Sequence, residues 1–431
     1  MVNTGMPNET STAAGSEPAP ELTATRPRLR VLAIDEEVPY PADTGKRIRT
    51  WNLLKRLAAR HDITLLCYGR ERGREFDVVR QCGIKLRLVD PLLELSGLAL
   101  SWRLLLNLIS PYPYSVQKHY TKRFQNKVDE LLSSSEFDLL HCEWTPYARY
   151  RTERFQIASV LATHNIESQI WERRADHAGG VLARIFFRMQ ARKMAAFERN
   201  NLPRMSVVTA VSPEDARQTA DWAQRSGTLV ENGVDLEQFR PAGSGESCEL
   251  LFLGSLDWFP NRDAVEYMVQ EILPLIQSAT PIATLRVVGR RPPKDFVRRI
   301  AAVPGVEVLG EVDDVRPCLE RAGVIVVPLR IGGGSRIKIL EALAMGKAVV
   351  STRVGAEGLA VQDGHNILLA DNPQDFAARV QQLMGSEEDR SRLGKNGRDL
   401  VEQRYSWDDC AAALEAAWYR AHDLHSGGTR D

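Results

Sequence analysis

Fully apolar runs alternate with amphipathic segments along most of the chain. The runs RVLAID (30–35) and ITLLCYG (63–69) lack the apolar–polar alternation of a half-exposed strand, so each predicts a strand buried on both faces. Between them, Trp51, Leu54 and Leu57 recur at helical spacing. Strands and helices that alternate in this way predict a parallel sheet with helices on both faces. Further strands are expected at residues 137–143, 158–165, 205–212, 248–254, 284–290, 306–310, 323–329, 347–352 and 366–370.

This rhythm restarts near the middle of the chain. Residues 222–246 end in a stretch rich in proline, glycine and serine, which is typical of a hinge. We therefore predict an α/β fold with two Rossmann-like, doubly wound parallel-sheet domains, at 29–222 and 223–405. Ligands of such sheets bind at the carboxyl ends of the strands, so the site is expected in the cleft where the two domains face each other. Residues 1–28 are expected to be a disordered tail and residues 424–431 a flexible one.

Charge and cysteine content narrow the class of protein. The chain has 56 Lys+Arg and 56 Asp+Glu residues, and this formal net charge of zero argues against a nucleic-acid partner. The six cysteines form neither a C-x-x-C pair nor a zinc-type cluster, which predicts reduced thiols and no metal site. The sequence also lacks the apolar core of a signal peptide and a charge-poor apolar run of ~20 residues. These features predict a cytoplasmic enzyme.

The most informative segment is PLRIGGGSRIKILEALAMGKAVVST (328–352). A buried strand ends there, three glycines let the backbone approach a ligand, and a helix is expected to start near Ser335. Backbone N–H groups at a helix N-terminus bind phosphate, and Arg336 and Lys338 add positive charge within the first turn. Glu341, later on the same helix, can accept hydrogen bonds from ribose hydroxyls. The alternative interpretation is a tight turn followed by solvated arginine, lysine and glutamate side chains.

Several further motifs occur with this segment in a fixed order, and together they resemble glycosyltransferase family 4, the retaining transferases with the GT-B fold. The N-terminal half matches more loosely, through the glycine-containing loop after the first strand, THN at 163–165 and TAVS at 209–212. The motifs of the C-terminal half are ENGVDLEQFRP (231–241), FLGSLDWFPN (252–261), LRVVGR (285–290), VEVLGEVDDVRPCLERAGVIVVPL (306–329), DGHNILLADNPQDFAARV (363–380) and YSW (405–407).

The resemblance implies that the C-terminal domain binds a nucleotide-sugar, UDP- or GDP-linked, and that the N-terminal domain binds the acceptor. By position, Glu341 would hold the ribose. Arg336 and Lys338, with the backbone of Gly334 and Ser335, would hold the diphosphate.

A second loop of the C-terminal domain is implied to complete the donor site. Gly254 and Ser255 begin this loop, which would approach the phosphates from the other side. Asn261 and Arg290 are further donor-site candidates, and Arg290 is alternatively a surface residue near the base. The helix expected at 406–423 resembles the segment that crosses back onto the N-terminal domain in GT-B proteins.

One position departs from the family pattern. The family commonly carries two glutamates separated by seven residues, and the first of them, which contacts the donor sugar, corresponds here to Gly333. Either backbone amides of residues 332–334 hold the sugar, or the donor preference is altered, or catalysis is lost. The GGGSRIKILEA-type run resembles a subgroup similar to exopolysaccharide-associated sugar transferases, which favours activity.

The resemblance also implies catalytic and acceptor residues in the N-terminal half. His164 would face the cleft near the donor sugar, where an imidazole can hydrogen-bond a hydroxyl or steady developing charge. Gly45 and Lys46 follow the first strand, where the family's glycine loop approaches the transferred group. The alternatives are a structural histidine and a solvent-exposed turn. The weaker acceptor candidates are Asp43, Arg47, His141 and Glu143.

The expected chemistry uses neither a metal nor a cofactor, because no D-x-D motif follows a strand. Positive side chains and helix-terminal amides would instead stabilise the diphosphate leaving group. The resemblance implies retention of configuration by front-face attack through an oxocarbenium-like state. Two alternatives stay open: a non-catalytic protein that binds a nucleotide-sugar, and a sugar-nucleotide epimerase, which would act without an acceptor.

Two apolar segments with basic residues bear on the acceptor. They are residues 95–114, followed by Lys118, Lys122 and Arg123, and residues 183–199. Either segment could rest on the inner face of a membrane, which would fit a lipid-linked acceptor rather than a free glycan. The alternative is that both are helices packed on the N-terminal sheet with solvated outer faces. The biological setting implied by the resemblance is the synthesis of a cell-surface polysaccharide.

Overall fold

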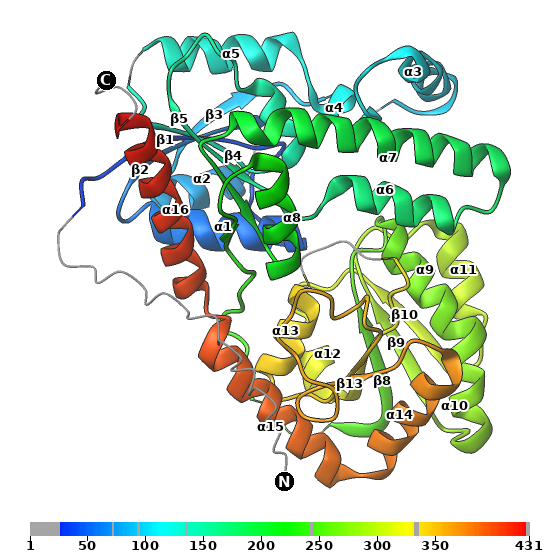
Figure 1. The fold of residues 1–431 in the computed structure, drawn as a ribbon. Helices are drawn as coiled ribbons and strands as arrows, with labels where there is room; N and C mark the ends of the chain where they lie inside the picture. Colours follow the sequence, from blue (N-terminus) through cyan, green and yellow to red (C-terminus); the bar gives the residue numbers. More distant parts are fainter. Residues whose placement is uncertain are drawn as a thin grey trace, which may run out of the picture.

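The protein is described by a computed structural model that covers residues 26–70, 73–92, 95–134, 136–241, 243, 245–331 and 336–427. Two α/β domains lie side by side, and a long C-terminal helix reaches from the second domain back to the first (Figure 1). Each domain is built on a parallel sheet between helices. The predicted fold class, two Rossmann-like doubly wound domains, is therefore confirmed.

The N-terminal domain, within the described ranges, has a seven-stranded sheet in the order β3-β2-β1-β4-β5-β6-β7. All of its strand pairs are parallel. The strands are β1 (Arg30–Ile34), β2 (Asp62–Tyr68), β3 (Lys85–Val89), β4 (Leu139–Cys142), β5 (Ala158–Ala162), β6 (Val207–Ala210) and β7 (Thr228–Leu229). The helices are α1 (Gly45–Leu57), α2 (Arg74–Gln81), α3 (Gly97–Ile109), α4 (Tyr114–His119), α5 (Lys122–Ser133), η1 (Thr145–Tyr150), α6 (Glu167–Asp176), α7 (Val181–Asn201), η2 (Leu202–Arg204) and α8 (Pro213–Ala223).

The C-terminal domain has, in the part that the structure describes, a six-stranded parallel sheet in the order β10-β9-β8-β11-β12-β13. The strands are β8 (Glu246–Leu253), β9 (Thr284–Val288), β10 (Val306–Gly310), β11 (Ala322–Val327), β12 (Val349–Ser351) and β13 (Leu368–Leu369). The helices are α9 (Phe259–Tyr267), η3 (Met268–Ile272), α10 (Leu273–Ala279), α11 (Lys294–Ala301), α12 (Arg316–Arg321), α13 (Ile337–Ala344), α14 (Pro373–Gly385), α15 (Glu387–Arg404) and α16 (Trp407–Gly427).

The first strand shows why its sequence is apolar at every position. Val31 and Ala33 belong to the core under α1 and α16, whereas Leu32 and Ile34 belong to the core under α5 and α7. Successive side chains of a strand point to opposite faces, so a sheet covered on both faces needs apolar residues throughout.

Two strands of the N-terminal domain were not predicted. β3 lies at the edge of the sheet, and its exposed Lys85 and Arg87 alternate with the buried Leu86. An edge strand with one solvated side has no fully apolar run, which was the pattern sought. β7 is only two residues long and is defined by its pairing with β6.

The chain crosses between the domains twice, and the two crossings lie side by side. The N–H of Val234 donates to the carbonyl of Tyr405 at 2.8 Å. The guanidinium of Arg49, on α1, donates to the carbonyls of Val230 (2.8 Å) and Glu231 (2.7 Å). These two adjacent crossings form the hinge between the domains.

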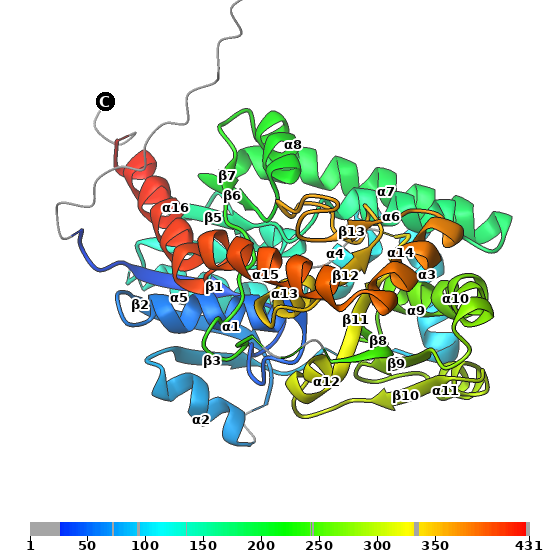
Figure 2. The same ribbon diagram turned by 90° about the horizontal axis from the view of Figure 1, so that it is seen from below.

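The C-terminal helix α16 completes the N-terminal domain. It follows directly after α15 of the C-terminal domain and continues along the N-terminal domain (Figure 2). Its fully buried Trp418 belongs to the same core as Leu57 of α1. The stretch expected as a tail, 424–431, begins inside α16, which extends to Gly427. The expected N-terminal tail lies outside the described residues except for 26–28.

Candidate active site

A cavity of about 280 Å³ lies between the domains. The N-terminal domain lines it with residues of α6, of α8 and of the loop before α8, including Arg173 and Asp215. The C-terminal domain lines it with Arg336, Glu357 and Tyr405. These residues follow the carboxyl ends of strands or lie on the hinge, which is where an open parallel sheet binds ligands.

A compact polar cluster stands at the start of α13. The ammonium of Lys338 donates to Asn261 Oδ1 at 2.8 Å, and Asn261 Nδ2 donates to the carbonyl of Ser255 at 2.8 Å. Lys338 Nζ also lies 4.7 Å from the centre of the Phe252 ring. Four of the predicted donor-site residues are thus brought together: Gly254, Ser255, Asn261 and Lys338.

Gly254 is needed here because the cluster approaches its backbone closely. A Cβ atom at this position would lie 2.7 Å from Lys338 Nζ and 2.8 Å from the side-chain carbon of Asn261. We expect Gly254→Ala to displace both side chains and to weaken nucleotide binding by ~10-fold, because the lysine moves from its position. Isothermal titration of a nucleoside diphosphate measures this effect.

Gly179→Ala is the matched control, since an added Cβ there meets nothing within 4 Å. It should bind the nucleotide as the parent protein does. Equal affinities for the parent and Gly254→Ala would show that the Lys338 position is unimportant for the nucleotide.

The surroundings of Lys338 disfavour its positive charge. Burial and, after it, the neighbouring Arg336 lower its pKa to about 7, against the opposing effect of Glu341. Burial likewise raises the pKa of Glu341 to about 8, against the effect of Lys338. In the described part of the chain no carboxylate lies within ion-pair distance of Lys338 Nζ. An anion delivered to α13 would remove this electrostatic cost.

Arg336 adopts a different place from the one predicted. The helix begins at Ile337, and Arg336 precedes it with a left-handed backbone, φ 54°. Its guanidinium lies 3.3 Å from a carboxylate oxygen of Glu357. Arg173, from α6 of the other domain, donates to both oxygens of the same carboxylate at 2.7 Å. Glu357 therefore connects Arg336 to the N-terminal domain.

Arg290 makes a second connection across the cleft. It lies at the end of β9, with Nε 3.4 Å from Ser255 Oγ and Nη1 3.3 Å from the carboxylate of Asp43. Asp43 also pairs with Arg47 at 2.9 Å. The structure thus places Arg290, Asp43 and Arg47 in one ionic chain between the domains.

Lys46 does not stand free in the loop after β1. Gly45 begins α1, and the ammonium of Lys46 lies 2.5 Å from Asp35 Oδ1 and 2.9 Å from Glu36 Oε1. Burial raises the pKa of Asp35 to about 8, and Lys46 opposes this rise. The carboxylates Asp35 and Glu36 were not singled out from the sequence, although Asp35 ends a predicted strand and Glu36 directly follows it. They fix the lysine at the cleft.

His164 is held by its neighbour Glu143. Its Nε2 lies 2.8 Å from the Glu143 carbonyl, and its side chain is 11% exposed. His141 Nε2 lies 2.6 Å from the Glu143 carboxylate. Burial would raise the pKa of Glu143, but hydrogen bonds from both histidines hold it well below its usual range.

His141 and Glu143 are buried next to His164 and do not line the surface of the cleft. His141 is fully buried and Glu143 is 2% exposed. Trp418 of α16 donates to His141 Nδ1 at 3.3 Å. The chain from Trp418 through His141 and Glu143 therefore positions His164. Gly333, Gly334 and Ser335, the remaining predicted donor residues, lie outside the described residues.

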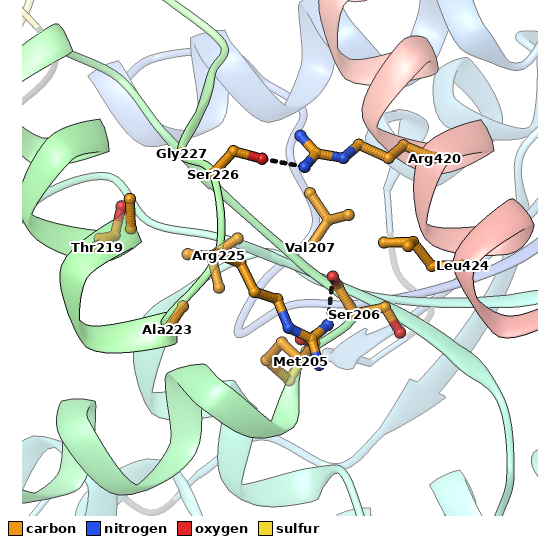
Figure 3. A pocket seen from close by; sticks show the side chains of 12 residues that line it. Met205, Ser206, Val207, Thr219, Ala223, Arg225, Ser226, Gly227, Arg420 and Leu424 are labelled. Atoms are coloured by element: carbon orange, nitrogen blue, oxygen red, sulfur yellow. Dashed lines mark hydrogen bonds between the residues drawn. The ribbon is translucent and has the colours of Figure 1, made fainter. Parts of the chain in front are cut away.

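A second cavity, of about 400 Å³, lies at the amino-terminal end of β6, and Figure 3 shows the residues that line it. Arg225 donates there to the carbonyl of Ser206 at 2.9 Å, and Arg420 donates to the hydroxyl of Ser226. Because these residues flank the amino-terminal end of β6, this cavity is separate from the cleft between the domains.

In the described ranges no group of three histidine, cysteine or carboxylate side chains has the arrangement of metal ligands. None of the helices in those ranges is both long and apolar enough to span a bilayer.

Each half of the chain matches a family of known proteins. Residues 45–238 match the family described as Glycosyltransferase Family 4. Residues 247–386 match the family described as Glycosyl transferases group 1. The two matches coincide with the two Rossmann-like domains.

Curated relatives match parts of the chain or nearly all of it. An uncharacterized glycosyltransferase of Methanocaldococcus jannaschii is 34% identical over 122 residues, 27% of this chain and 34% of that protein. The D-inositol 3-phosphate glycosyltransferase of Streptomyces bingchenggensis is 26% identical over 216 residues, 45% of this chain and 47% of that protein. An uncharacterized 44.6 kDa protein in the cps region of Klebsiella pneumoniae is 18% identical over 388 residues, 87% of this chain and 96% of that protein. The alignments thus span less than half the length of the first two relatives.

Solved structures share the fold over nearly the whole chain. Anabaena HepE, in complex with UDP and glucose, has a TM-score of 0.64 at 14% identity and covers 90% of this chain and 99% of its own. Sucrose-phosphate synthase of Thermosynechococcus elongatus has a TM-score of 0.67 at 17% identity and covers 91% and 99%. The two halves of this chain thus match two glycosyltransferase family models, and the whole chain shares the two-domain fold of these solved structures.

Proposed function

We propose that this chain transfers a sugar from a nucleoside-diphosphate donor to a hydroxyl of a glycan or lipid-linked acceptor, without a metal ion and with retention of configuration. The observation that carries the proposal is the partly buried Lys338 at the start of α13, held by Asn261 with no carboxylate partner among the described residues. The Anabaena structure, whose complex holds UDP and glucose, supports a uridine nucleotide as the first donor to test.

The leaving group sets the main electrostatic demand of this reaction. A nucleoside diphosphate departs with negative charge on its terminal phosphate, and fixed positive groups stabilise that charge in the transition state. Lys338, Arg336 and the amino-terminal N–H groups of α13 are the groups proposed to do so. Two cations and a helix terminus supply the kind of charge that a divalent ion supplies in other transferases.

The transfer itself is written as a front-face substitution. The bond between the sugar's anomeric carbon and the phosphate oxygen breaks, and its electron pair leaves with the nucleoside diphosphate. The bond between the acceptor oxygen and the anomeric carbon forms on the same face, and the acceptor proton passes to the departing phosphate oxygen. His164 is proposed to hydrogen-bond the sugar, and Lys46 to orient the acceptor.

The relative encoded in the cps region of Klebsiella pneumoniae supports an acceptor that belongs to a cell-surface polysaccharide. We place the acceptor on the side of the N-terminal domain and the reaction at the cytoplasmic face of the membrane. This part of the proposal rests on that likeness and on the apolar segment 95–114.

A turnover screen tests the proposed function. Purified protein is incubated with UDP-, GDP- and ADP-sugars in the presence of EDTA, and release of the nucleoside diphosphate is followed. One donor class should be turned over slowly in water alone and faster with a glycan or polyprenyl-linked sugar. A donor that binds without any turnover would favour a non-catalytic binding protein. A donor converted to its epimer without acceptor would favour an epimerase.

Nucleotide binding should depend on pH through Lys338. Its pKa is about 7 in the protein alone, so at pH 8 most of the lysine is neutral. A bound diphosphate stabilises the ammonium and raises its pKa, so binding at pH 8 should take up about one proton. Affinity should accordingly fall by up to ~10-fold for each pH unit above 7.

Titration of UDP in two buffers of different ionisation enthalpy measures this uptake. Glu341 interacts with the same lysine, and its own pKa of about 8 means that it titrates in the same pH range. Lys338→Met separates the two contributions, because only Glu341 then remains. Identical heats in both buffers for the parent protein would contradict the assignment of Lys338 to the diphosphate.

A further inference from the structure

The helix α3 contacts the rest of the protein through its polar side. The one residue that it buries is Asn107, which is completely inaccessible. Asn107 Nδ2 donates to Gln117 Oε1 at 2.6 Å, and Gln190 Nε2 on α7 donates to Asn107 Oδ1 at 2.7 Å. Lys193 donates to the last carbonyls of the helix, at Asn107 (2.6 Å) and Leu108 (3.1 Å). A helix of a soluble domain normally buries its apolar side instead.

The apolar residues of α3 lie on its opposite side and are exposed to solvent. Leu98, Trp102, Leu105 and Ile109 follow one another at helical spacing and are 83%, 65%, 56% and 86% exposed. At ~100° per residue these four positions form one stripe, about 180° away from Asn107. We call this stripe, with the flanking Leu106 and Leu108, the α3 face.

This concentration of exposed apolar side chains sets α3 apart from the rest of the described chain. Three further large apolar residues are exposed at the start of α7, which contacts α3: Val181, Leu182 and Ile185. The others, Trp258, Ile282 and Leu424, stand singly. Isolated exposed apolar residues are ordinary, whereas a contiguous group marks a surface that another phase or partner covers.

The charges around the α3 face are of one dominant sign. The helix contains no acidic residue, and its only charged residue is Arg103. Exposed basic residues follow on α4 and α5 and on the outer side of α7: Lys118, Lys122, Arg123, Arg184, Arg188 and Arg192. The nearby carboxylates Asp90 and Asp176 are each engaged with one of these arginines. Apolar residues bordered by arginine and lysine fit the interface of an anionic bilayer.

We propose that the α3 face lies in the headgroup layer of an anionic membrane and holds the N-terminal domain there. Leucine and isoleucine side chains enter the boundary of the acyl chains, Trp102 sits at the interface, and the basic residues meet lipid phosphates. α3 belongs to the N-terminal domain and stands at the edge of the molecule away from the C-terminal domain (Figure 1). The consequence for the acceptor, a lipid-linked sugar at that membrane, rests on the proposed function.

Flotation of the full chain with vesicles tests this inference. Vesicles of phosphatidylglycerol and phosphatidylethanolamine in equal parts should carry the protein upward, and phosphatidylcholine vesicles should carry far less. The triple variant Leu98→Glu, Leu105→Glu and Ile109→Glu should lower the partition coefficient by ~100-fold or more, because three apolar side chains that would enter the bilayer are lost. Ile282→Glu is the matched control: this residue is 72% exposed and lies in the C-terminal domain. It should float like the parent.

Each result of this experiment either supports or overturns membrane binding by the α3 face. No flotation with the anionic vesicles, or equal flotation of the triple variant and the parent, overturns the inference. A dimer that the triple variant abolishes, without vesicle binding, would show that a second copy covers the face instead. Nucleotide-induced thermal stabilisation, measured without vesicles, must be the same in the triple variant and the parent, which confirms its fold. If that stabilisation fails in the parent while flotation succeeds, the proposed function fails and the membrane surface stands.

Discussion

Replacing Lys338 with methionine is expected to lower kcat/KM for the nucleotide-sugar by ~10³-fold, about 4 kcal/mol of transition-state stabilisation. Methionine keeps the volume of the side chain and removes only the charge aimed at the leaving group. Because desolvation and the neighbouring Arg336 both disfavour this ammonium, its loss should leave the nucleotide-free protein equally stable or more stable. Steady-state kinetics and thermal unfolding measure the two effects on the same sample.

Lys347→Met is the matched control for this result. Lys347 is buried, and it donates to the carbonyls of Gly243, Glu320 and Ala322 at 2.6, 2.6 and 3.2 Å. Its replacement leaves these carbonyls unpaired and should lower the thermal stability while the affinity for the donor stays unchanged. If Lys338→Met behaves like Lys347→Met, Lys338 is a structural residue and the donor site lies elsewhere.

Trp418→Ala is expected to lower the free energy of unfolding by ~3–5 kcal/mol, because it removes a fully buried tryptophan side chain between α16 and the N-terminal sheet. Trp418 is fully buried, and its ring lies 5.4 Å from that of His61 and 5.6 Å from that of His141. The substitution also leaves His141 without its indole donor. Urea unfolding followed by circular dichroism gives the loss of stability.

Trp258→Ala serves as the control, since Trp258 is 43% exposed and its removal should change stability by less than ~1 kcal/mol. A loss of under ~1 kcal/mol in Trp418→Ala as well would mean that α16 docks only loosely on the N-terminal domain. The two adjacent crossings at Val234 and Tyr405 would then be the main connection between the domains.

The fold was predictable from the sequence because its strands are buried on both faces. Runs such as 323–329, found as β11, are apolar at every position and leave no ambiguity about burial. The edge strand β3 was missed for the opposite reason: Lys85 and Arg87 are solvated, so its pattern is shared by many loops. β7 is recognisable only from its partner β6.

The site was predictable to the extent that it is local. Lys338 and Glu341 lie on one helix after a glycine loop, so their neighbourhood can be read from the sequence. The contact of Arg173 with Glu357 joins residues 184 positions apart in different domains, and no local pattern encodes it. The same holds for the anchoring of Lys46, which depends on how the loop after β1 folds back onto Asp35.

The apolar segment 95–114 shows what the sequence leaves open. Its composition fits a helix packed on the sheet as well as one at a membrane surface. Only the structure shows that Asn107 faces inward and that the stripe through Leu98 and Ile109 faces outward. The deciding residue is a single asparagine, paired with Gln190 of a helix far along the chain.

The central claim, that α13 and the loop at Gly254 hold the diphosphate of the donor, is tested most directly by a crystal structure with bound nucleoside diphosphate. We predict phosphate oxygens within hydrogen-bond distance of Lys338 Nζ and of the amino-terminal N–H groups of α13, with the ribose hydroxyls at Glu341. In that complex Arg336 should turn from Glu357 toward the phosphates. A nucleotide bound instead in the cavity at Arg225 and Arg420, or in the cleft away from Lys338, would contradict the account.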